Sequence, residues 1–228
     1  MHILAIETTG PYCSVAILDH EENITEVSGK DVLNHLQTLT PMIQQALEEC
    51  QLQLSDIDVI AVSVGPGSFT GIRIGVSTAR ALSQVTGIKL MEIPTLLAFG
   101  CSQGEAHQVV CPIFDARRNQ VYAGAYRNFE ELVPGGPYLL DEFLEKLEGY
   151  DDLVFMGDGL KAYGEAIKAC AGERKITFIE ESQRAGAVCE MARDLLSVKP
   201  LLDYNDLEPN YMRLPEAERK LKEKSGGK

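Results

Sequence analysis

The sequence has few basic residues for its length. Its 228 residues include 21 lysines and arginines against 34 aspartates and glutamates, which gives a net charge of −13. Nucleic acids and anionic membranes attract proteins through a positive field, so binding of either over a whole face of this chain is disfavoured. Hydrophobic residues make up 45% and charged residues 24%, which is typical of a folded globular protein rather than of a disordered chain.

Long apolar runs and paired cysteines are also missing. No stretch approaches the roughly 18 consecutive apolar residues of a transmembrane helix, and residues 1–7 lack the basic start and apolar run of a signal peptide. The six cysteines are scattered, without a Cys-x-x-Cys pair, which favours buried roles in a reducing compartment over a disulfide or zinc framework. We therefore expect a cytoplasmic protein that does not associate with membranes.

The motifs of a self-sufficient enzyme are absent as well. The four histidines show neither His-Glu-x-x-His nor His-x-x-x-His spacing, and the chain has no Gly-x-Ser-x-Gly elbow and no Walker A loop. His35 is interpreted as a capping or surface residue rather than a base. Asp115, Arg117 and Arg118 could bind an anion, although a charged turn between strands is the simpler interpretation. We predict no catalytic residue and no metal ligand.

Apolar periodicity predicts a first half of three strands followed by alternating helices and strands. The strands are expected at 3–6, 13–18, 24–28, 57–62 and 90–93, and the helices at 32–50, 71–86 and 95–101. Three meandering strands followed by helix–strand units are typical of a ribonuclease-H-like lobe.

A comparable pattern begins again after a polar segment at 102–108. Strands are expected at 109–114, 120–126, 153–156 and 176–179, and helices at 160–170 and 185–198. In both halves an apolar strand ends in a carboxylate, Glu7 or Asp115, and leads through a turn to another strand. We expect an N-terminal lobe over 1–101, a second, smaller lobe over 102–212 and a basic tail over 213–228 with a charge of +3.

Two loops of the first half could contact a phosphate. One is Glu7-Thr8-Thr9-Gly10, and the other begins with Gly65-Pro66-Gly67-Ser68 and opens a helix, whose first N–H groups form a potential anion site. A hairpin turn and a purely structural tight turn are the alternatives. The candidate phosphate or nucleotide contacts are Thr8, Thr9, Gly65, Gly67 and Ser68.

The first two helices have faces suited to a partner. Apolar residues of the helix at 32–50 cover roughly half of its circumference, which is wider than its own core requires. In the next helix Gly71 and Gly75 stand one turn apart and form a small-residue ridge with Ala79. Such a ridge allows close approach of another helix, either inside the lobe or across a dimer.

Several of these segments together resemble a known family. Residues 3–9, 13–17, 65–75 with Ser77-Thr78-Ala79-Arg80, the turn Asp115-Ala116-Arg117-Arg118 with Val121-Tyr122, and 209–213 resemble, in this order, the bacterial TsaB family, also called YeaZ or glycoprotease-like M22. The resemblance extends to about residue 218. It implies the actin/Hsp70/sugar-kinase (ASKHA) fold, an α/β fold with two ribonuclease-H-like lobes.

The resemblance also implies a function. Members of this family act in forming N6-threonylcarbamoyladenosine at position 37 of tRNAs that read codons beginning with A. They are non-catalytic partners of TsaD, a paralogue that transfers the threonylcarbamoyl group, and work together with the ATPase TsaE. The resemblance thus implies a heterodimer with TsaD, a homodimer, contact with tRNA only through the complex, and no cofactor other than ATP or ADP at the contact with TsaD.

The paralogue also accounts for the missing chemistry. In TsaD a His-x-x-x-His pair after the Gly-Pro-Gly unit binds the catalytic metal, and the corresponding positions here are Thr95 and Phe99, which cannot replace imidazole. The resemblance makes the two helix faces the TsaD-binding surface, with Leu33, Leu36, Leu39, Ile43, Leu47, Gly71, Arg73, Gly75, Val76 and Ala79 as contacts. The alternative function is an independent ASKHA-type ATPase or small-molecule kinase that uses Thr8, Thr9 and 157–159.

Overall fold

Two five-stranded sheets form the framework of the protein. The computed structural model describes residues 1–29, 34–102, 104–179 and 185–212. The first sheet has the order β3-β2-β1-β4-β5, with β1 (Ile3–Glu7), β2 (Ser14–Leu18), β3 (Ile24–Ser28), β4 (Val59–Gly65) and β5 (Lys89–Pro94). The first three strands pair antiparallel, whereas β4 and β5 run parallel to β1.

The second sheet repeats this topology. Its order, β8-β7-β6-β9-β10, is that of the first sheet with β6 in the place of β1. The strands are β6 (Val109–Asp115), β7 (Gln120–Arg127), β8 (Glu130–Leu139), β9 (Asp152–Met156) and β10 (Lys175–Ile179). The predicted α/β class and the two ribonuclease-H-like lobes are confirmed, while β8 is a strand that the sequence pattern did not predict.

Local sequence explains where the main elements lie. All residues of β1 and β4 are buried, as expected for central strands covered on both faces, so these segments are apolar runs rather than alternating patterns. Helix α2 (Phe69–Thr86) begins after Ser68, whose hydroxyl accepts a hydrogen bond from Gly71 N. It ends at Gly87, which has a φ of 79° in the left-handed region.

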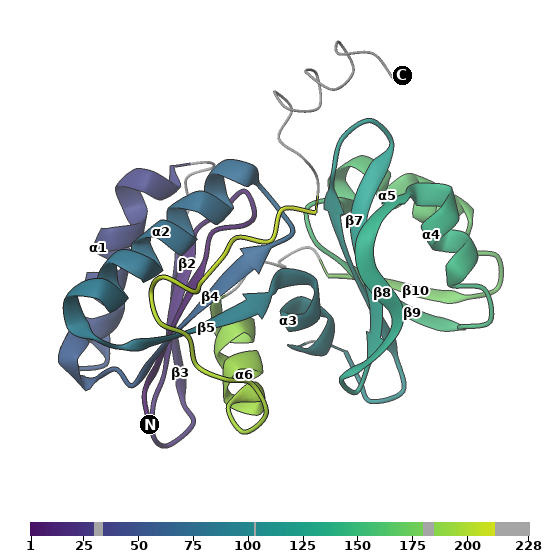
Figure 1. Ribbon diagram of the computed structural model, residues 1–228. Coiled ribbons are helices and arrows are strands. Elements are labelled where there is room, and N and C mark those ends of the chain that lie inside the picture. The colour runs from purple at the N-terminus through teal and green to yellow at the C-terminus, as the bar shows by residue number, and fades with distance from the viewer. Residues whose placement is uncertain (30–33, 103, 180–184, 213–228) are drawn as a thin grey trace, which may run out of the picture.

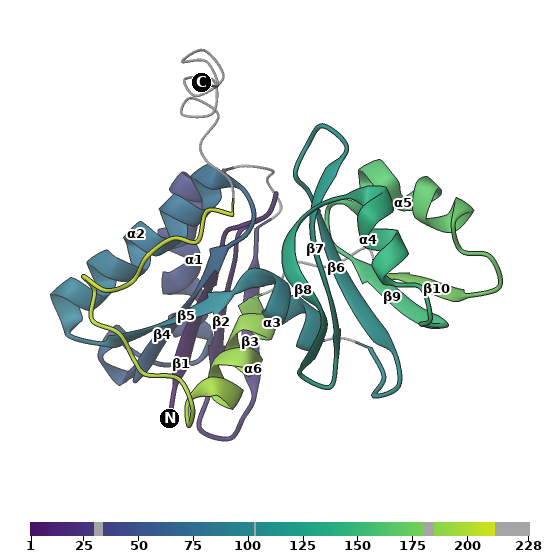
Figure 2. The same cartoon turned by 45° about the vertical axis from the view of Figure 1, so that its right-hand side comes forward.

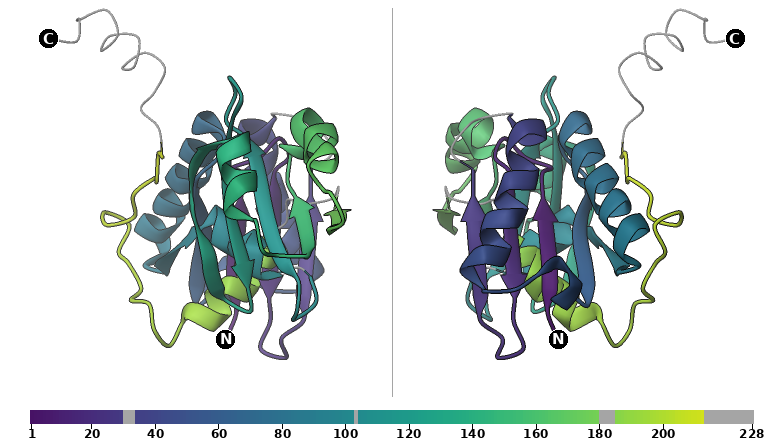
Figure 3. Two further views of the ribbon diagram at one scale, coloured as in Figure 1. Left: turned by 90° about the vertical axis from the view of Figure 1, so that its right-hand side faces the viewer. Right: turned by 90° about the vertical axis from the view of Figure 1, so that its left-hand side faces the viewer.

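The helices and the two sheets form five alternating layers (Figure 1). Helices α1 (His35–Glu49) and α2 cover the outer face of the first sheet, and α4 (Leu140–Lys146) and α5 (Leu160–Ala169) cover the outer face of the second, as the two side views of Figure 3 show. Between the sheets lie α3 (Thr95–Ser102) and α6 (Ala185–Leu195). The two lobes thus share a helical layer.

The expected boundary of the second lobe at residue 212 is wrong. Ala185, Val188 and Ala192 of α6 pack against Ile3 and its neighbours in the first sheet. The chain therefore leaves the first lobe after α3, builds the second sheet and returns. Apolar periodicity identifies α6 as a helix but does not indicate which sheet its apolar face covers.

After α6 the chain crosses the first lobe as an extended strap, residues 196–212, which runs along the outside of β5 and past α2 (Figures 1 and 2). Leu202 pairs with Leu90 of β5 through hydrogen bonds of 2.8 and 2.9 Å. Leu207 is fully buried in the core beneath α1 and α2. Farther on, Asn210 N donates to Val64 O over 2.8 Å, at the carboxyl end of β4. The strap thus covers an edge strand that would otherwise be free to pair.

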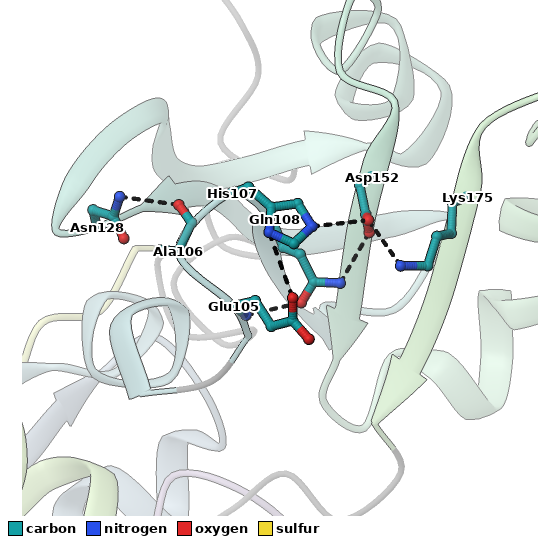
Figure 4. Close-up of polar contacts among 7 residues, drawn as sticks. All are labelled: Glu105, Ala106, His107, Gln108, Asn128, Asp152 and Lys175. Atoms are coloured by element: carbon teal, nitrogen blue, oxygen red, sulfur yellow. Dashed lines mark hydrogen bonds and ion pairs between the residues drawn. The ribbon is translucent and has the colours of Figure 1, made fainter.

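A polar network holds the connection between α3 and the second sheet (Figure 4). Asp152, at the start of β9, accepts hydrogen bonds from Gln108 Nε2 (3.0 Å) and Lys175 Nζ (2.9 Å). His107 Nε2 lies 3.4 Å from the same carboxylate, and Gln108 Oε1 accepts from Glu105 N over 2.9 Å. Because of Lys175 and the other donors, the pKa of Asp152 is lowered. The network fixes the connecting segment to the base of β9.

Candidate functional site

The predicted phosphate loop of the first lobe is packed against helix α2. Thr8 Oγ1 donates to Gly71 O over 2.8 Å, and Ser68 N donates to Thr9 O over 2.6 Å. A Cβ at Gly71 would overlap the Thr8 carbonyl, and one at Gly75 would overlap the Thr8 hydroxyl. These glycines are therefore required because the turn after β1 lies directly on the helix.

Glu7, at the end of β1, is a carboxyl group without solvent access. Its Oε1 accepts hydrogen bonds from Thr9 N (2.5 Å) and Thr9 Oγ1 (2.6 Å). Its Oε2 has no hydrogen-bond partner within the described ranges, and neither does the hydroxyl of Ser63 on the neighbouring strand. Burial disfavours the charged form and raises the pKa of Glu7. Burial therefore favours the protonated form of this carboxyl group over its charged form.

These contacts do not fit a nucleotide phosphate at the turn after β1. The side chains of Thr8 and Thr9 are buried and donate their hydrogen bonds inside the protein. The space where a Cβ of Gly65 would lie is filled by Asn210 O at 2.5 Å, and that of Gly67 by Thr9 O at 2.5 Å. Ser68 is partly exposed, but its hydroxyl caps α2. Thr8, Thr9, Gly65 and Gly67 thus pack the turn within the first lobe, and a phosphate role for these residues and Ser68 stays a prediction.

The predicted interface residues divide into two groups. Gly71, Gly75, Val76 and Ala79 of α2, together with Leu39 and Ile43 of α1, are buried against the first sheet and cannot contact a partner; for these six the prediction is wrong. Helical periodicity identifies an apolar face but not how much of it the protein itself covers. Leu33 lies outside the described residues.

Some side chains of α1 and α2 remain exposed to solvent, and these form the exposed remainder of the two helices that a partner can contact. Leu36 of α1 has 78% of its surface exposed and Leu47 is partly buried. Arg73 of α2 is exposed, with its guanidinium 4.7 Å from the centre of the Phe69 ring, which in turn stacks on Tyr211 of the strap. Val85, near the end of α2 and with 87% of its surface exposed, was not predicted, because no sequence signal separates it from the buried apolar residues of that helix.

His35 also proves structural. It is buried at the start of α1, and its Nε2 donates to Gly10 O over 2.8 Å. This bond ties α1 to the turn after β1. The expected surface position is therefore wrong.

Thr95 and Phe99, for which the resemblance implied the loss of a histidine pair, both contact neighbouring segments of the protein. Thr95 is buried, and its Oγ1 accepts a hydrogen bond from Gly65 N over 3.2 Å. Phe99, one helical turn later, packs edge-to-face on Phe114 of the second sheet, with ring centres 5.7 Å apart. Across the described residues no group of three or more His, Cys, Asp or Glu side chains could hold a metal ion.

The turn after β6 occupies the equivalent place in the second lobe, and it is open. Asp115 is exposed; its Oδ1 accepts from Arg117 N (2.7 Å) and Tyr163 OH (3.2 Å). Asp115 N donates to the carboxylate of Asp158 over 3.1 Å. Asp158 retains exposed surface, yet burial of its carboxylate, with the charge of Asp115 nearby, raises its pKa to about 6.

The backbone of this second turn is unusual. Arg117, Arg118 and Asn119 have φ values of 62°, 58° and 59°. Left-handed conformations are tolerated by asparagine but cost other residues about 1–2 kcal/mol each. The segment Ala116–Gln120 is closed by Ala116 N to Gln120 O (3.0 Å) and Gln120 N to Arg117 O (3.2 Å). Both arginines therefore hold a strained conformation.

Comparison with known proteins decides the family. Residues 32–220 match the model of TsaD, tRNA N6-adenosine threonylcarbamoyltransferase. The chain is also 30% identical over 227 residues to the tRNA threonylcarbamoyladenosine biosynthesis protein TsaB of Bacillus subtilis, with 96% of this chain and 97% of that protein covered. The chain belongs to the TsaB family. The TsaB of Haemophilus influenzae is 27% identical, with 92% of this chain and 93% of that protein covered.

Solved structures agree with this TsaB assignment. YeaZ from Pseudomonas aeruginosa superimposes with a TM-score of 0.75 at 25% identity, covering 92% of this chain and 100% of that one. The activator of a 2-hydroxyisocaproyl-CoA dehydratase from Clostridium difficile superimposes with a TM-score of 0.53 at 10% identity, covering 89% of this chain and 100% of that one. The second likeness shows the fold alone. The ASKHA fold is thus confirmed for this TsaB-family chain, and none of its described helices is long and apolar enough to cross a bilayer.

Proposed function

We propose that this TsaB-family chain is the non-catalytic partner of a TsaD-type transferase in forming N6-threonylcarbamoyladenosine on tRNA. Support comes from nearly full-length similarity to proteins named for this biosynthesis and from the match to the transferase model. The observation that carries the non-catalytic role is the filling of the two metal-ligand positions by Thr95 and Phe99. Both side chains are buried and make packing or hydrogen-bonding contacts there.

We place the partner surface on the exposed remainder of α1 and α2. Leu36 and Val85 are the most exposed large hydrophobic residues of the two helices, and exposed apolar side chains on a helix pair are candidates for interface anchors. The same surface would serve a second copy of this chain in the absence of the transferase. TsaE and tRNA would join through the complex, any ATP or ADP would lie at the transferase contact, and the site of action would be the cytoplasm.

An independent ATPase or small-molecule kinase is less well supported. That function would require Thr8 and Thr9 to face a nucleotide, whereas both side chains are buried and hydrogen-bonded within the first lobe. Titration of the isolated protein with Mg-ATP and an assay for turnover test this alternative.

Reconstitution of the modification tests the proposal. We expect the transferase and the TsaE-type ATPase to modify a tRNA transcript efficiently only when this chain is added. Leu36→Glu should weaken co-elution with the transferase by about tenfold or more, because a charge would replace an exposed apolar anchor. Leu139→Glu is the matched control, since Leu139 is an exposed leucine of the second lobe, in β8. Full modification without this chain would refute the function, and an intact complex with Leu36→Glu would refute the surface.

A further inference from the structure

The turn between β6 and β7 presents two adjacent arginines to solvent. Arg117 and Arg118 are exposed, and within the described part of the chain neither guanidinium has an ion pair or a hydrogen bond. The turn projects from the top of the second sheet in Figure 2. Two neighbouring exposed arginines stand out on a chain whose net charge is −13.

The conformation of the turn is unfavourable for these residues. Arg118 and Asn119 are the central residues of a turn closed by Gln120 N to Arg117 O, and both have positive φ. Such turns strongly prefer asparagine, aspartate or glycine at the central positions. Glycine at 117 or 118 would relieve the strain, so the arginines are not needed to form the turn. Strained residues that the surrounding structure holds in place are commonly functional.

The neighbouring acids contact the backbone of the turn rather than the arginine side chains. Asp115 binds the backbone N–H of Arg117 at 2.7 Å, and Asp158 binds the backbone N–H of Asp115 at 3.1 Å. Both carboxylates therefore contact main chain on the sheet side of the turn. Together they position the hairpin from which the guanidinium groups extend.

We propose that Arg117 and Arg118 contact phosphate groups of the tRNA substrate within the assembled complex. The proposal rests on the proposed function and adds a direct RNA contact by this chain. A planar guanidinium group can donate two parallel hydrogen bonds to two oxygens of one phosphate group. Carboxylates of the transferase are the other possible ligands, but the proposed docking helices α1 and α2 lie on the first lobe, whereas this turn belongs to the second. A short cationic turn also reconciles an acidic chain with an RNA substrate, because only two side chains need approach the backbone.

The test compares three variants of the full chain in complex with the transferase. Binding of an unmodified tRNA transcript is measured by fluorescence anisotropy over a salt series. Arg117→Gln with Arg118→Gln should weaken tRNA binding by roughly 5- to 30-fold and reduce the slope of log affinity against log salt by about 1–2, because each lost phosphate contact removes just under one unit. Co-elution with the transferase should be unchanged.

Two single variants separate charge from turn geometry. Arg118→Gly should raise the melting temperature, since it relieves strain, and still weaken tRNA binding. Asn119→Gly, the matched control, should keep both arginines and bind tRNA as the unaltered chain does. If Arg118→Gly is more stable and yet binds tRNA more weakly, misfolding cannot explain the weaker binding.

Three outcomes would overturn the proposal. The first is equal tRNA affinity and salt slope for the double glutamine variant and the unaltered chain. The second is that the double glutamine variant no longer co-elutes with the transferase while the dependence of tRNA affinity on salt is unchanged. This result would show that the arginines contact carboxylates of the transferase. The third is a loss of tRNA affinity in Asn119→Gly that is as large as the loss in the double glutamine variant. Failure of the proposed function is distinguished separately, because the unaltered chain would then not stimulate modification.

Discussion

The two lobes share one topology and use its central turn in opposite ways. In the first lobe the strand β1 ends in Glu7, and the following turn is buried against α2. In the second lobe β6 ends in Asp115, and the following turn is exposed with its backbone in the left-handed region. The helices differ as well, since α2 has 18 residues and α5 has 10. Equal strand order therefore does not mean equal sites: close packing of a helix against the turn decides whether a ligand can enter.

The strap is the largest difference between the lobes, and removing its anchor should have the largest effect. Leu207→Ala should lower the free energy of unfolding by about 2–5 kcal/mol, because a fully buried leucine side chain leaves a cavity. Urea denaturation measures the loss. Val198→Ala in the same segment, where 75% of the valine is exposed, is the control and should change stability by less than about 0.5 kcal/mol. Similar values for the two would show that the strap does not stabilise the first lobe.

A matched pair of helical glycines tests the packing of the turns. Gly71→Ala places a methyl group on the Thr8 carbonyl. Overpacking of this kind typically costs about 1–3 kcal/mol, and we expect a loss of stability near the upper end of that range. Gly164→Ala in α5 brings the new Cβ to 3.3 Å from the Phe178 ring. The ring must move slightly, and the higher helix propensity of alanine should offset that cost, so stability should change little. Thermal unfolding of both variants gives the comparison. Equal stabilities would contradict the close contact between turn and helix.

The buried acid of the first lobe should make stability depend on pH. The pKa of Glu7 is raised in the folded state, so the folded protein binds more protons than the unfolded chain above the ordinary value of 4.5. Stability from this group is therefore complete below that value and is lost as pH rises through the folded-state pKa, by at most about 1.4 kcal/mol per pH unit. Glu7→Gln should remove this contribution and flatten the curve.

Urea denaturation at a series of pH values checks the prediction for Glu7. Glu165→Gln provides the control, because the Glu165 side chain is exposed on α5 and forms an ion pair with Lys168 on the surface. An unaltered pH dependence in Glu7→Gln would mean that Glu7 is ionised in the folded protein.

Much of the fold follows from local patterns. The apolar runs of β1 and β4, the Ser68 cap and the stop at Gly87 all lie in the sequence itself, because backbone geometry and capping depend on neighbouring residues. The same is true of the repeat, in which Glu7 and Asp115 each end a central strand. The strand β8 escaped prediction because its interior contains Pro134, Gly135, Gly136 and Pro137, which normally interrupt strands.

The site was less predictable than the fold. The string from Gly65 to Gly75 identified the family, but its physical purpose depends on Thr8, which lies more than fifty residues away in the sequence and directly on the helix in space. Likewise, nothing near Gly65 in the sequence indicates that Asn210 O fills the space beside it. Burial of Leu39 and Val76 could not be separated from exposure of Leu36 by periodicity alone.

The sequence by itself determined the α/β class, the duplicated order of elements, the acidic charge and the family, since these depend on composition and on contacts between near neighbours. Only the tertiary structure decided that α6 returns to the first sheet, that the strap covers β5 and that one turn is buried while its counterpart is open. Those features arise from packing between segments distant along the chain, where shape and the space beside a glycine decide which surfaces meet.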